Sequence, residues 1–317
     1  CRRWLTKITR AVKQMNRAGE RAVPDASGDV PGEAAPVRSR ARFPGERRVR
    51  LVASDLDGTL LRPDRTVSAR TREALRRVSE AGIVVVLVTA RAPDTVRPLA
   101  QSAGATGLAI CCNGALIYDL DRDEIVRHTP LAVDTVRRLV RALREAVPDV
   151  CFSFRRHDVY ACEPAYRHIG IVGDDALVDD ALALCEEPTV KLNVGHPTHG
   201  AEVLLEHIRA LGLDGFEATH SGAPFVEVAA AGVTKAWALE SLCTSLGITS
   251  DEVIAFGDAP NDLAMLRWAG HGVAVANAHP EVLAAVELRA PSNKEDGVAQ
   301  TLERLLGQRP GADAQEQ

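Results

Sequence analysis

Asp55 and Asp57 stand two positions apart, directly after the short apolar run Val49 to Ala53. The run predicts a buried strand that ends in two carboxylates. One carboxylate can attack phosphorus as a nucleophile, while the second protonates a leaving oxygen and later activates water. A cation such as Mg²⁺ is then needed to hold carboxylate and phosphate together despite their like charge. The alternative interpretation is an ordinary Asp-Gly turn after a strand.

Two further apolar runs end in polar side chains. Thr89 and Asp258 each follow such a run, and Lys235 begins the predicted helix that precedes the second one. If the strands are parallel neighbours, these side chains meet Asp55 in one crevice at the carboxyl edge of the sheet. There, the Thr89 hydroxyl can donate to a phosphate oxygen, and Lys235 can offset the charge of Asp55 and the phosphate together.

The segment after Asp258 adds metal chemistry. Asp258 itself offers an oxygen ligand for Mg²⁺. Asn261 and Asp262 begin the next predicted helix, where they can order the waters of the metal or Lys235. Arg91 has two interpretations, a contact to a substrate phosphate or an exposed arginine at the start of a helix.

Alternating strand and helix patterns position these residues and predict an α/β fold. The expected architecture is a Rossmann-like, doubly wound parallel sheet with right-handed crossovers. Predicted strands lie at 49–55, 83–88, 107–112, 252–256 and 272–275, and predicted helices at 67–81, 94–102, 235–246, 261–269, 281–286 and 298–306.

The pattern changes at about residue 130, which predicts an inserted domain. Short strands are expected at 151–154, 159–161, 190–194, 215–219 and 225–228, and helices at 131–146, 175–184 and 200–211. We predict five segments: a basic, disordered arm (1–48), a catalytic core in two parts (49–131 and 218–307), an α/β cap (132–217) and a disordered tail (308–317).

Composition is that of a globular protein, with 317 residues, 46% hydrophobic and 26% charged. Residues 1–50 hold 13 Lys and Arg against 5 Asp and Glu, although the net charge is −5. Residues 1–16 could form a basic amphipathic helix or a frayed extension, and because no interleaved aromatic residues accompany the charge of the arm, nucleic-acid binding is not expected. No apolar run reaches membrane-spanning length. Seven cysteines without disulfide or metal spacing favour a reducing, cytoplasmic location. Oligomeric state stays open.

The motifs resemble those of the haloacid dehalogenase superfamily of phosphohydrolases. Within it, the chain is most similar to the Cof-like subfamily, which carries a large α/β (type IIB) cap after the second motif. The resemblance spans about residues 50–307. It rests on Asp55–Leu61, Val88–Arg91, Asn113–Ala115, Gly232–Lys235 and Phe256–Asp262, with lesser similarity at Asn277–Ala278 and Ser292–Gly297.

The resemblance implies a role for each motif residue. Asp55 would be the nucleophile that becomes an aspartyl-phosphate, and Asp57 the general acid and base. Mg²⁺ would be bound by the Asp55 carboxylate, the Asp57 main-chain carbonyl and Asp258. Thr89 and Lys235 would bind the phosphoryl group, and Asn261 and Asp262 would support the metal. Asn261 is also counted among the phosphate- and substrate-binding residues, and Asn113 and Gly114 would lie near the substrate. Ala90 and Ala236 depart from the family pattern, which usually has Gly at both places.

We therefore predict a Mg²⁺-dependent phosphatase acting on a small soluble phosphate monoester. Sugar phosphates, nucleotides, flavin mononucleotide and pyridoxal phosphate all remain open as substrates. The alternatives are a phosphomutase of the same superfamily, which would return the phosphoryl group to a sugar, and a non-catalytic protein that binds a phosphate ligand.

Overall fold

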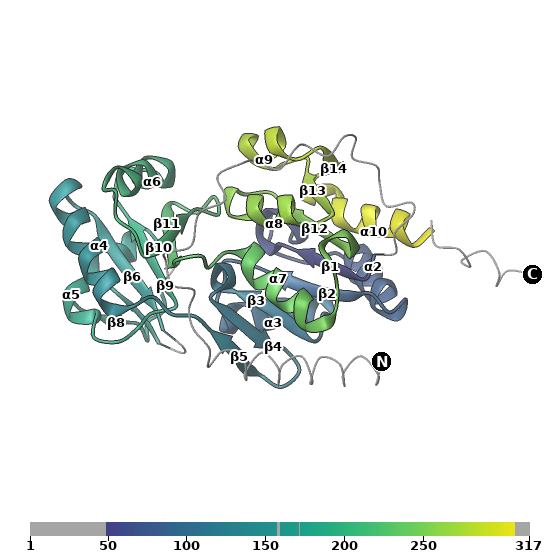
Figure 1. The fold of residues 1–317 in the computed structure, drawn as a ribbon, viewed down its shortest axis with the longest axis horizontal. Coiled ribbons are helices and arrows are strands. Elements are labelled where there is room, and N and C mark those ends of the chain that lie inside the picture. Colours follow the sequence, from purple (N-terminus) through teal and green to yellow (C-terminus); the bar gives the residue numbers. More distant parts are fainter. Residues whose placement is uncertain (1–48, 157–158, 171, 308–317) are drawn as a thin grey trace, which may run out of the picture.

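The computed structural model describes residues 49–156, 159–170 and 172–307, and it contains two β-sheets (Figure 1). The arm predicted at 1–48 and the tail predicted at 308–317 lie outside the described residues. Within the described residues, no helix is both long enough and apolar enough to cross a membrane.

The larger sheet has eight strands in the order β14-β13-β12-β1-β2-β3-β4-β5. The first six are mutually parallel, and β3, β4 and β5 continue as an antiparallel meander. The central strands are fully buried apolar runs, as expected for a sheet covered on both faces. The bounds are β1 (Leu51–Ser54), β2 (Val84–Val88), β3 (Leu108–Cys111), β4 (Leu116–Asp119), β5 (Glu124–His128), β12 (Val253–Gly257), β13 (His271–Val275) and β14 (Leu288–Ala290).

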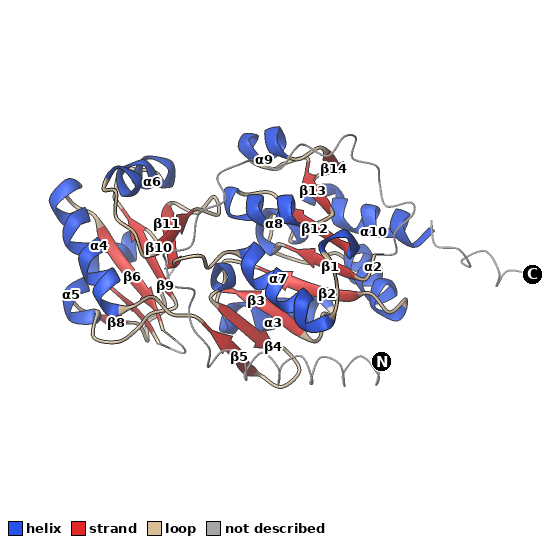
Figure 2. Ribbon diagram, viewed as in Figure 1, coloured by secondary structure: helices blue, strands red, loops and turns tan. Residues whose placement is uncertain are grey.

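Helices cover both faces of this sheet (Figure 2). One group, in which α2 contacts both α3 and α10, packs apart from the pair α7 and α8. The helices are α2 (Ala69–Glu80), α3 (Pro93–Ala103), α7 (Lys235–Leu246), α8 (Leu263–Trp268), α9 (Pro280–Ala285) and α10 (Gly297–Gly307). The α/β class and the doubly wound parallel core are therefore confirmed.

The smaller sheet has six strands in the order β10-β11-β9-β6-β7-β8. Its helices share one hydrophobic core with the sheet and lie on the side away from the larger sheet (Figure 1). The elements are α4 (Val133–Ala146), β6 (Cys151–Arg155), β7 (Tyr160–Cys162), β8 (Leu177–Val178), α5 (Ala181–Leu184), β9 (Lys191–Gly195), α6 (Ala201–Ala210), β10 (Phe216–Thr219) and β11 (Phe225–Ala230).

The second boundary of the insertion lies later than predicted. A border at 217/218 would cut through β10, and β11 pairs antiparallel with both β10 and β9 in the smaller sheet. We therefore propose that the inserted unit comprises residues 132–230. Its two ends connect to the core by short segments, because β5 of the larger sheet ends at His128 and α7 begins at Lys235, shortly after β11.

Other differences from the predicted elements are local. The helix expected at 175–184 is reduced to Ala181–Leu184, where the Asp180 side chain caps the first turn, and β8 occupies part of the remainder. The strands β4, β5 and β14 were not predicted. The hairpin of β4 and β5 turns at a run of charged residues that resembles a loop, and β14 is only three residues long.

Candidate active site

Asp55 lies at the carboxyl end of β1, in the middle of the larger sheet. Its backbone N–H donates to the Phe256 carbonyl (3.0 Å), so the first motif is held beside β12. The chain then turns sharply, and Gly58 adopts a left-handed conformation (φ +80°). A Cβ atom at Gly58 would lie 2.3 Å from Oδ2 of Asp258. Glycine is thus required twice, for the turn and for the close approach of the two motifs.

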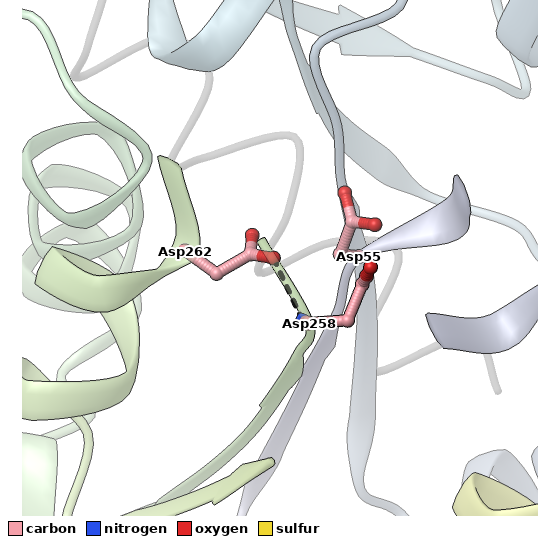
Figure 3. Close-up of side chains that lie close together, drawn as sticks. All are labelled: Asp55, Asp258 and Asp262. Carbon is pink, nitrogen blue, oxygen red and sulfur yellow. Dashed lines mark hydrogen bonds between the residues drawn. The ribbon is translucent and has the colours of Figure 1, made fainter. Parts of the chain in front are cut away.

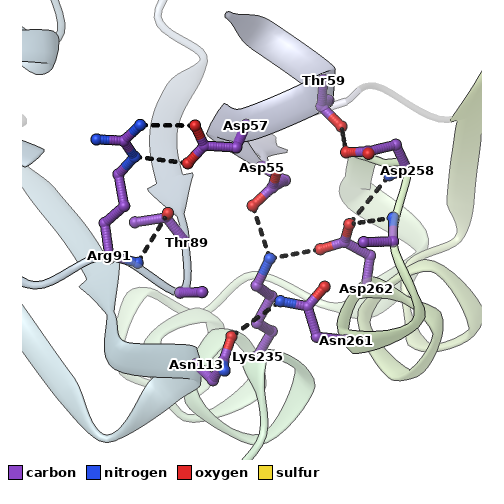
Figure 4. A network of polar contacts seen from close by, with 12 residues as sticks. Asp55, Asp57, Thr59, Thr89, Arg91, Asn113, Lys235, Asp258, Asn261 and Asp262 are labelled. Atoms are coloured by element: carbon purple, nitrogen blue, oxygen red, sulfur yellow. Dashed lines mark hydrogen bonds and ion pairs between the residues drawn. The ribbon is translucent and has the colours of Figure 1, made fainter. Parts of the chain in front are cut away.

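Lys235 joins the motifs from below (Figure 4). Its ammonium donates to Oδ1 of Asp55 (2.7 Å) and to Oδ1 of Asp262 (2.6 Å), and only 1% of the residue is exposed. Thr234 caps the helix by accepting from the Trp237 N–H (3.1 Å), which fixes Lys235 in the first turn of α7. Burial acts to lower the pKa of Lys235, but the Asp262 and Asp55 carboxylates outweigh it and raise the pKa, so the ammonium stays charged.

Three carboxylates surround this ammonium. Oxygen atoms of Asp55, Asp258 and Asp262 lie within 4.8 Å of one another (Figure 3). Both oxygens of Asp262 already accept hydrogen bonds, Oδ1 from Lys235 and Oδ2 from the backbone N–H groups of Asp258 and Ala259 (both 3.0 Å). Asp262 therefore positions the loop and the lysine, while Asp55 and Asp258 are left to bind a cation.

The charges of this cluster fit a divalent cation. One ammonium offsets only part of the charge of two buried carboxylates and one partly buried carboxylate. Burial, with the Asp262 carboxylate as the next cause, raises the pKa of Asp258 to about 7. Burial also raises the pKa of Asp55, against the opposing effect of Lys235. A hard cation favours oxygen ligands and would stabilise both carboxylates in their ionised forms.

Asp57 points away from this cluster, to the side where Arg91 holds it (Figure 4). The guanidinium donates from Nε to Oδ2 (2.5 Å) and from Nη2 to Oδ1 (2.6 Å), and 45% of the Asp57 side chain is exposed. Hydrogen bonding to Asp57 raises the pKa of Arg91. The sequence offered a phosphate contact or an exposed surface position for Arg91; the structure shows a partly buried arginine paired with Asp57, and the phosphate contact stays a prediction.

Thr89 is buried at the end of β2. Its Oγ1 accepts from the Arg91 N–H (3.1 Å), which leaves the hydroxyl proton free to donate elsewhere. Thr89 and Arg91 thus form one turn that faces Asp55 and Asp57 in Figure 4.

Asn113 and Asn261 form a buried pair beside Lys235 (Figure 4). Nδ2 of Asn261 donates to Oδ1 of Asn113 (3.0 Å), and Nδ2 of Asn113 donates to Oε2 of Glu227 in the inserted unit (3.2 Å). Because the Asn261 amide N–H₂ is directed at Asn113, its other atom is an acceptor, which does not suit a phosphate oxygen. This geometry gives Asn261 a supporting role beside Lys235, and its predicted phosphate contact stays a prediction.

Gly114 also has a structural explanation that differs from the predicted substrate contact. It is left-handed (φ +104°), and a Cβ atom there would lie 2.3 Å from the Thr234 carbonyl oxygen. Glycine therefore lets the loop after β3 approach the start of α7, directly beside Lys235.

Two asparagines, Asn277 and Asn293, hold the backbone of the first motif by hydrogen bonds. Nδ2 of Asn277 donates to the Gly58 carbonyl (2.8 Å), and Nδ2 of Asn293 donates to the Leu61 carbonyl (2.8 Å). The two asparagines are themselves joined, because the Asn293 N–H donates to Oδ1 of Asn277 (2.9 Å). Their sequence positions match the two lesser motifs, for which the sequence alone gave no role.

Two residues of the inserted unit were missed by the sequence analysis. Lys191 donates to the Ala90 carbonyl (3.0 Å) and forms an ion pair with Glu227. Glu227 stands inside an otherwise apolar strand, and a charge at such a position is a signal of a buried partner that could have identified it.

Comparison with known proteins agrees with this geometry. The family model for haloacid dehalogenase-like hydrolases matches residues 52–302. The chain belongs to this family. It is 28% identical to the 5-amino-6-(5-phospho-D-ribitylamino)uracil phosphatase YitU of Bacillus subtilis, over 82% of this chain and 99% of the relative. It is 29% identical to the pyridoxal phosphate phosphatase YbhA of Escherichia coli, over 79% and 96% of the two chains.

A solved structure supports the fold. BT1666 of Bacteroides thetaiotaomicron superposes with a TM-score of 0.72 at 24% identity, over 86% of this chain and 100% of that one. The predicted superfamily and the prediction of a phosphatase are thereby confirmed for this haloacid dehalogenase-like hydrolase.

The contact between Gly58 and Asp258 predicts a defect in cation binding. Gly58→Ala should require more Mg²⁺ and lower the turnover of an aryl phosphate about 5- to 150-fold, because overpacking of about 1–3 kcal/mol displaces the Asp258 carboxylate. Turnover is measured as a function of Mg²⁺ concentration.

Gly104→Ala is the matched control, since Gly104 is also left-handed (φ +67°) but a Cβ atom there has nothing within 4 Å. Both variants carry the backbone strain, and only Gly58→Ala carries the clash. An unchanged Mg²⁺ requirement in Gly58→Ala would show that the two motifs do not share a cation.

Proposed function

We propose that this hydrolase is a Mg²⁺-dependent phosphatase of a small phosphate monoester, with Asp55 as its nucleophile. The observation that carries the proposal is the buried ion-pair network of Lys235 with Asp55 and Asp262, formed next to the Asp258 carboxylate. YitU and YbhA, as named, act on small phosphate esters, which supports the same class of substrate here.

Asp55 and Asp258 are the carboxylates that would hold Mg²⁺, together with the main-chain carbonyl of Asp57. The cation would supply positive charge that offsets the repulsion between these carboxylates and the phosphate. Thr59 contributes by donating from Oγ1 to Oδ1 of Asp258 (2.5 Å), which orients that carboxylate and leaves Oδ2 for the cation.

The hydrogen bond from Lys235 selects the attacking oxygen of Asp55. Oδ1 accepts from the ammonium, so Oδ2 is the oxygen that forms a bond to phosphorus while the ester P–O bond breaks. The Thr89 hydroxyl, whose proton is free, donates to the phosphoryl group. An aspartyl-phosphate on Asp55 and a leaving alcohol result.

Asp57 would handle the protons of both steps. It gives a proton to the leaving oxygen and then takes one from the water that attacks the aspartyl-phosphate, which releases inorganic phosphate and restores Asp55. Its contact with Arg91 holds the partly exposed carboxylate beside Asp55.

We propose a cytoplasmic location from the state of the cysteine thiols. The six cysteines within the described residues are buried and free. Thiols stay reduced in the cytoplasm, which supports a cytoplasmic protein.

Replacement of the nucleophile tests the core of the proposal. Asp55→Asn should lower the turnover of p-nitrophenyl phosphate by at least about 10³-fold, because the amide cannot form the acyl-phosphate. Excess chelator should stop the wild-type protein, and added Mg²⁺ should restore it. Asp64→Asn removes an exposed carboxylate nearby and serves as the control. Wild-type turnover in chelator, or in Asp55→Asn, would refute the mechanism.

The role of Asp57 is tested by the leaving group. Asp57→Asn should lower turnover of an alkyl phosphate by about 10²–10⁴-fold, since an alkoxide needs the proton. With p-nitrophenyl phosphate the first step needs no acid, so rapid mixing should show a burst of one p-nitrophenolate per active site, followed by a stall. Equal losses on both substrates, without a burst, would argue that Asp57 has another role.

A further inference from the structure

Four of the polar contacts between the inserted unit and the rest of the described structure bear on this inference, and one of them reaches the candidate active site. Arg155 contacts Asp94 (2.8 Å), Glu202 contacts His279 (3.3 Å), and Lys191 contacts the Ala90 carbonyl. The fourth contact is made by Glu227, which is only 2% exposed and meets the side chain of Asn113.

The carboxylate of Glu227 can only accept hydrogen bonds, and this fixes its neighbours in turn. Asn113 must direct its N–H₂ group at Glu227, so its oxygen faces Asn261. Asn261 must then direct its own N–H₂ group at Asn113. Oδ1 of Asn261 is consequently left over, and it is buried without a hydrogen-bond partner within the described structure. One acceptor-only group thus sets the orientation of two amides.

The left-over acceptor belongs to the residue that precedes Asp262. Figure 4 shows Asn261 beside Lys235, with its oxygen directed away from Asn113. The ammonium of Lys235 has three donors, of which Asp55 and Asp262 use two. An acceptor in this place is compatible with the donors of the lysine or with waters of a bound cation, whereas an N–H₂ group would oppose them.

We propose that Glu227 is a positioning residue of the active site. It acts through Asn113 on the amide of Asn261 and keeps an acceptor, not a donor, beside Lys235. The proposal rests on the proposed phosphatase function of the site. Since Glu227 lies on β11 of the inserted unit, the amide pair is held in this orientation only while that unit is seated on the larger sheet.

Glu227→Gln tests the orientation directly, because it preserves shape and replaces one acceptor oxygen with a donor N–H₂ group. Lys191, which can only donate, faces the other oxygen of Glu227. In the variant, Lys191 takes the remaining oxygen, the new N–H₂ group faces Asn113, and both asparagines turn over. We expect kcat for p-nitrophenyl phosphate to fall about tenfold, which corresponds to about 1.4 kcal/mol.

A second substitution should reverse this effect. In Glu227→Gln combined with Lys191→Met, nothing competes for the glutamine oxygen, so it can accept from Asn113 again. We expect kcat of the double variant to return to within about threefold of Lys191→Met alone. This residual difference corresponds to about 0.6 kcal/mol, which is at the low end of the net contribution of one hydrogen bond. A purely structural role for the ion pair predicts the opposite, namely that the double variant is at least as impaired as Glu227→Gln.

Glu163→Gln is the matched control. Glu163 is a buried carboxylate of the same unit, but its partners Arg144, Phe152 and Ala181 all lie within that unit. This variant should lower the melting temperature without the kcat loss of Glu227→Gln. If Glu163→Gln and Glu227→Gln lower kcat equally, the effect is general destabilisation and the proposal is wrong.

An independent readout separates this inference from the proposed function. The chain has six asparagines, so selective ¹⁵N-asparagine labelling gives six side-chain amide pairs in an NMR spectrum. The signals of Asn113 and Asn261 should both move in Glu227→Gln and return in the double variant. If the wild-type protein has no turnover, the proposed function fails. These two signals still test whether Glu227 sets the orientation of the amides of Asn113 and Asn261. Signals that stay in place in Glu227→Gln would overturn it.

Discussion

The buried ammonium of Lys235, held between Asp55 and Asp262, is the interaction on which the site depends. Removing one partner of a buried ion pair costs about 3–5 kcal/mol, because it leaves an uncompensated charge. The three residues come from the end of β1, the start of α7 and the loop after β12. Their meeting therefore requires the parallel neighbours β1 and β12 and the close approach of α7, so the fold and the chemistry are specified by the same contacts.

The charge balance of this network determines how ligands can enter. Three carboxylates against one ammonium leave an excess of negative charge in a buried place, which repels a phosphate dianion. A divalent cation beside Asp55 and Asp258 would offset that excess and so lessen the repulsion of a phosphate near Oδ2 of Asp55. Asp262 would take no part in cation binding, because its oxygens already accept from Lys235 and from two backbone N–H groups.

The sequence predicted the parts of the site that lie at strand ends. Asp55, Thr89 and Asp258 could be brought together on paper because parallel strands share one carboxyl edge. Partners fixed by tertiary packing could not be predicted. The pairing of Arg91 with Asp57 depends on side-chain direction in two loops, and the pairing of β11 with β9 depends on strand partners that an isolated apolar run does not reveal. The early boundary at 217 and the missed Glu227 have this same cause.

The amide side chains of Asn113 and Asn261 link Glu227 in the inserted unit to the surroundings of Lys235 by hydrogen bonds. An asparagine has nearly the same shape in either orientation, so packing alone does not choose between them. Here the choice is made at one end by a carboxylate, which has no donor, and at the other end the consequence is a buried oxygen with no partner among the described residues. A chain of hydrogen bonds that begins in the inserted unit and ends next to Asp262 therefore makes the electrostatics around Lys235 depend on the seating of that unit. The inserted unit therefore contributes to the electrostatic environment in which Asp55 must act.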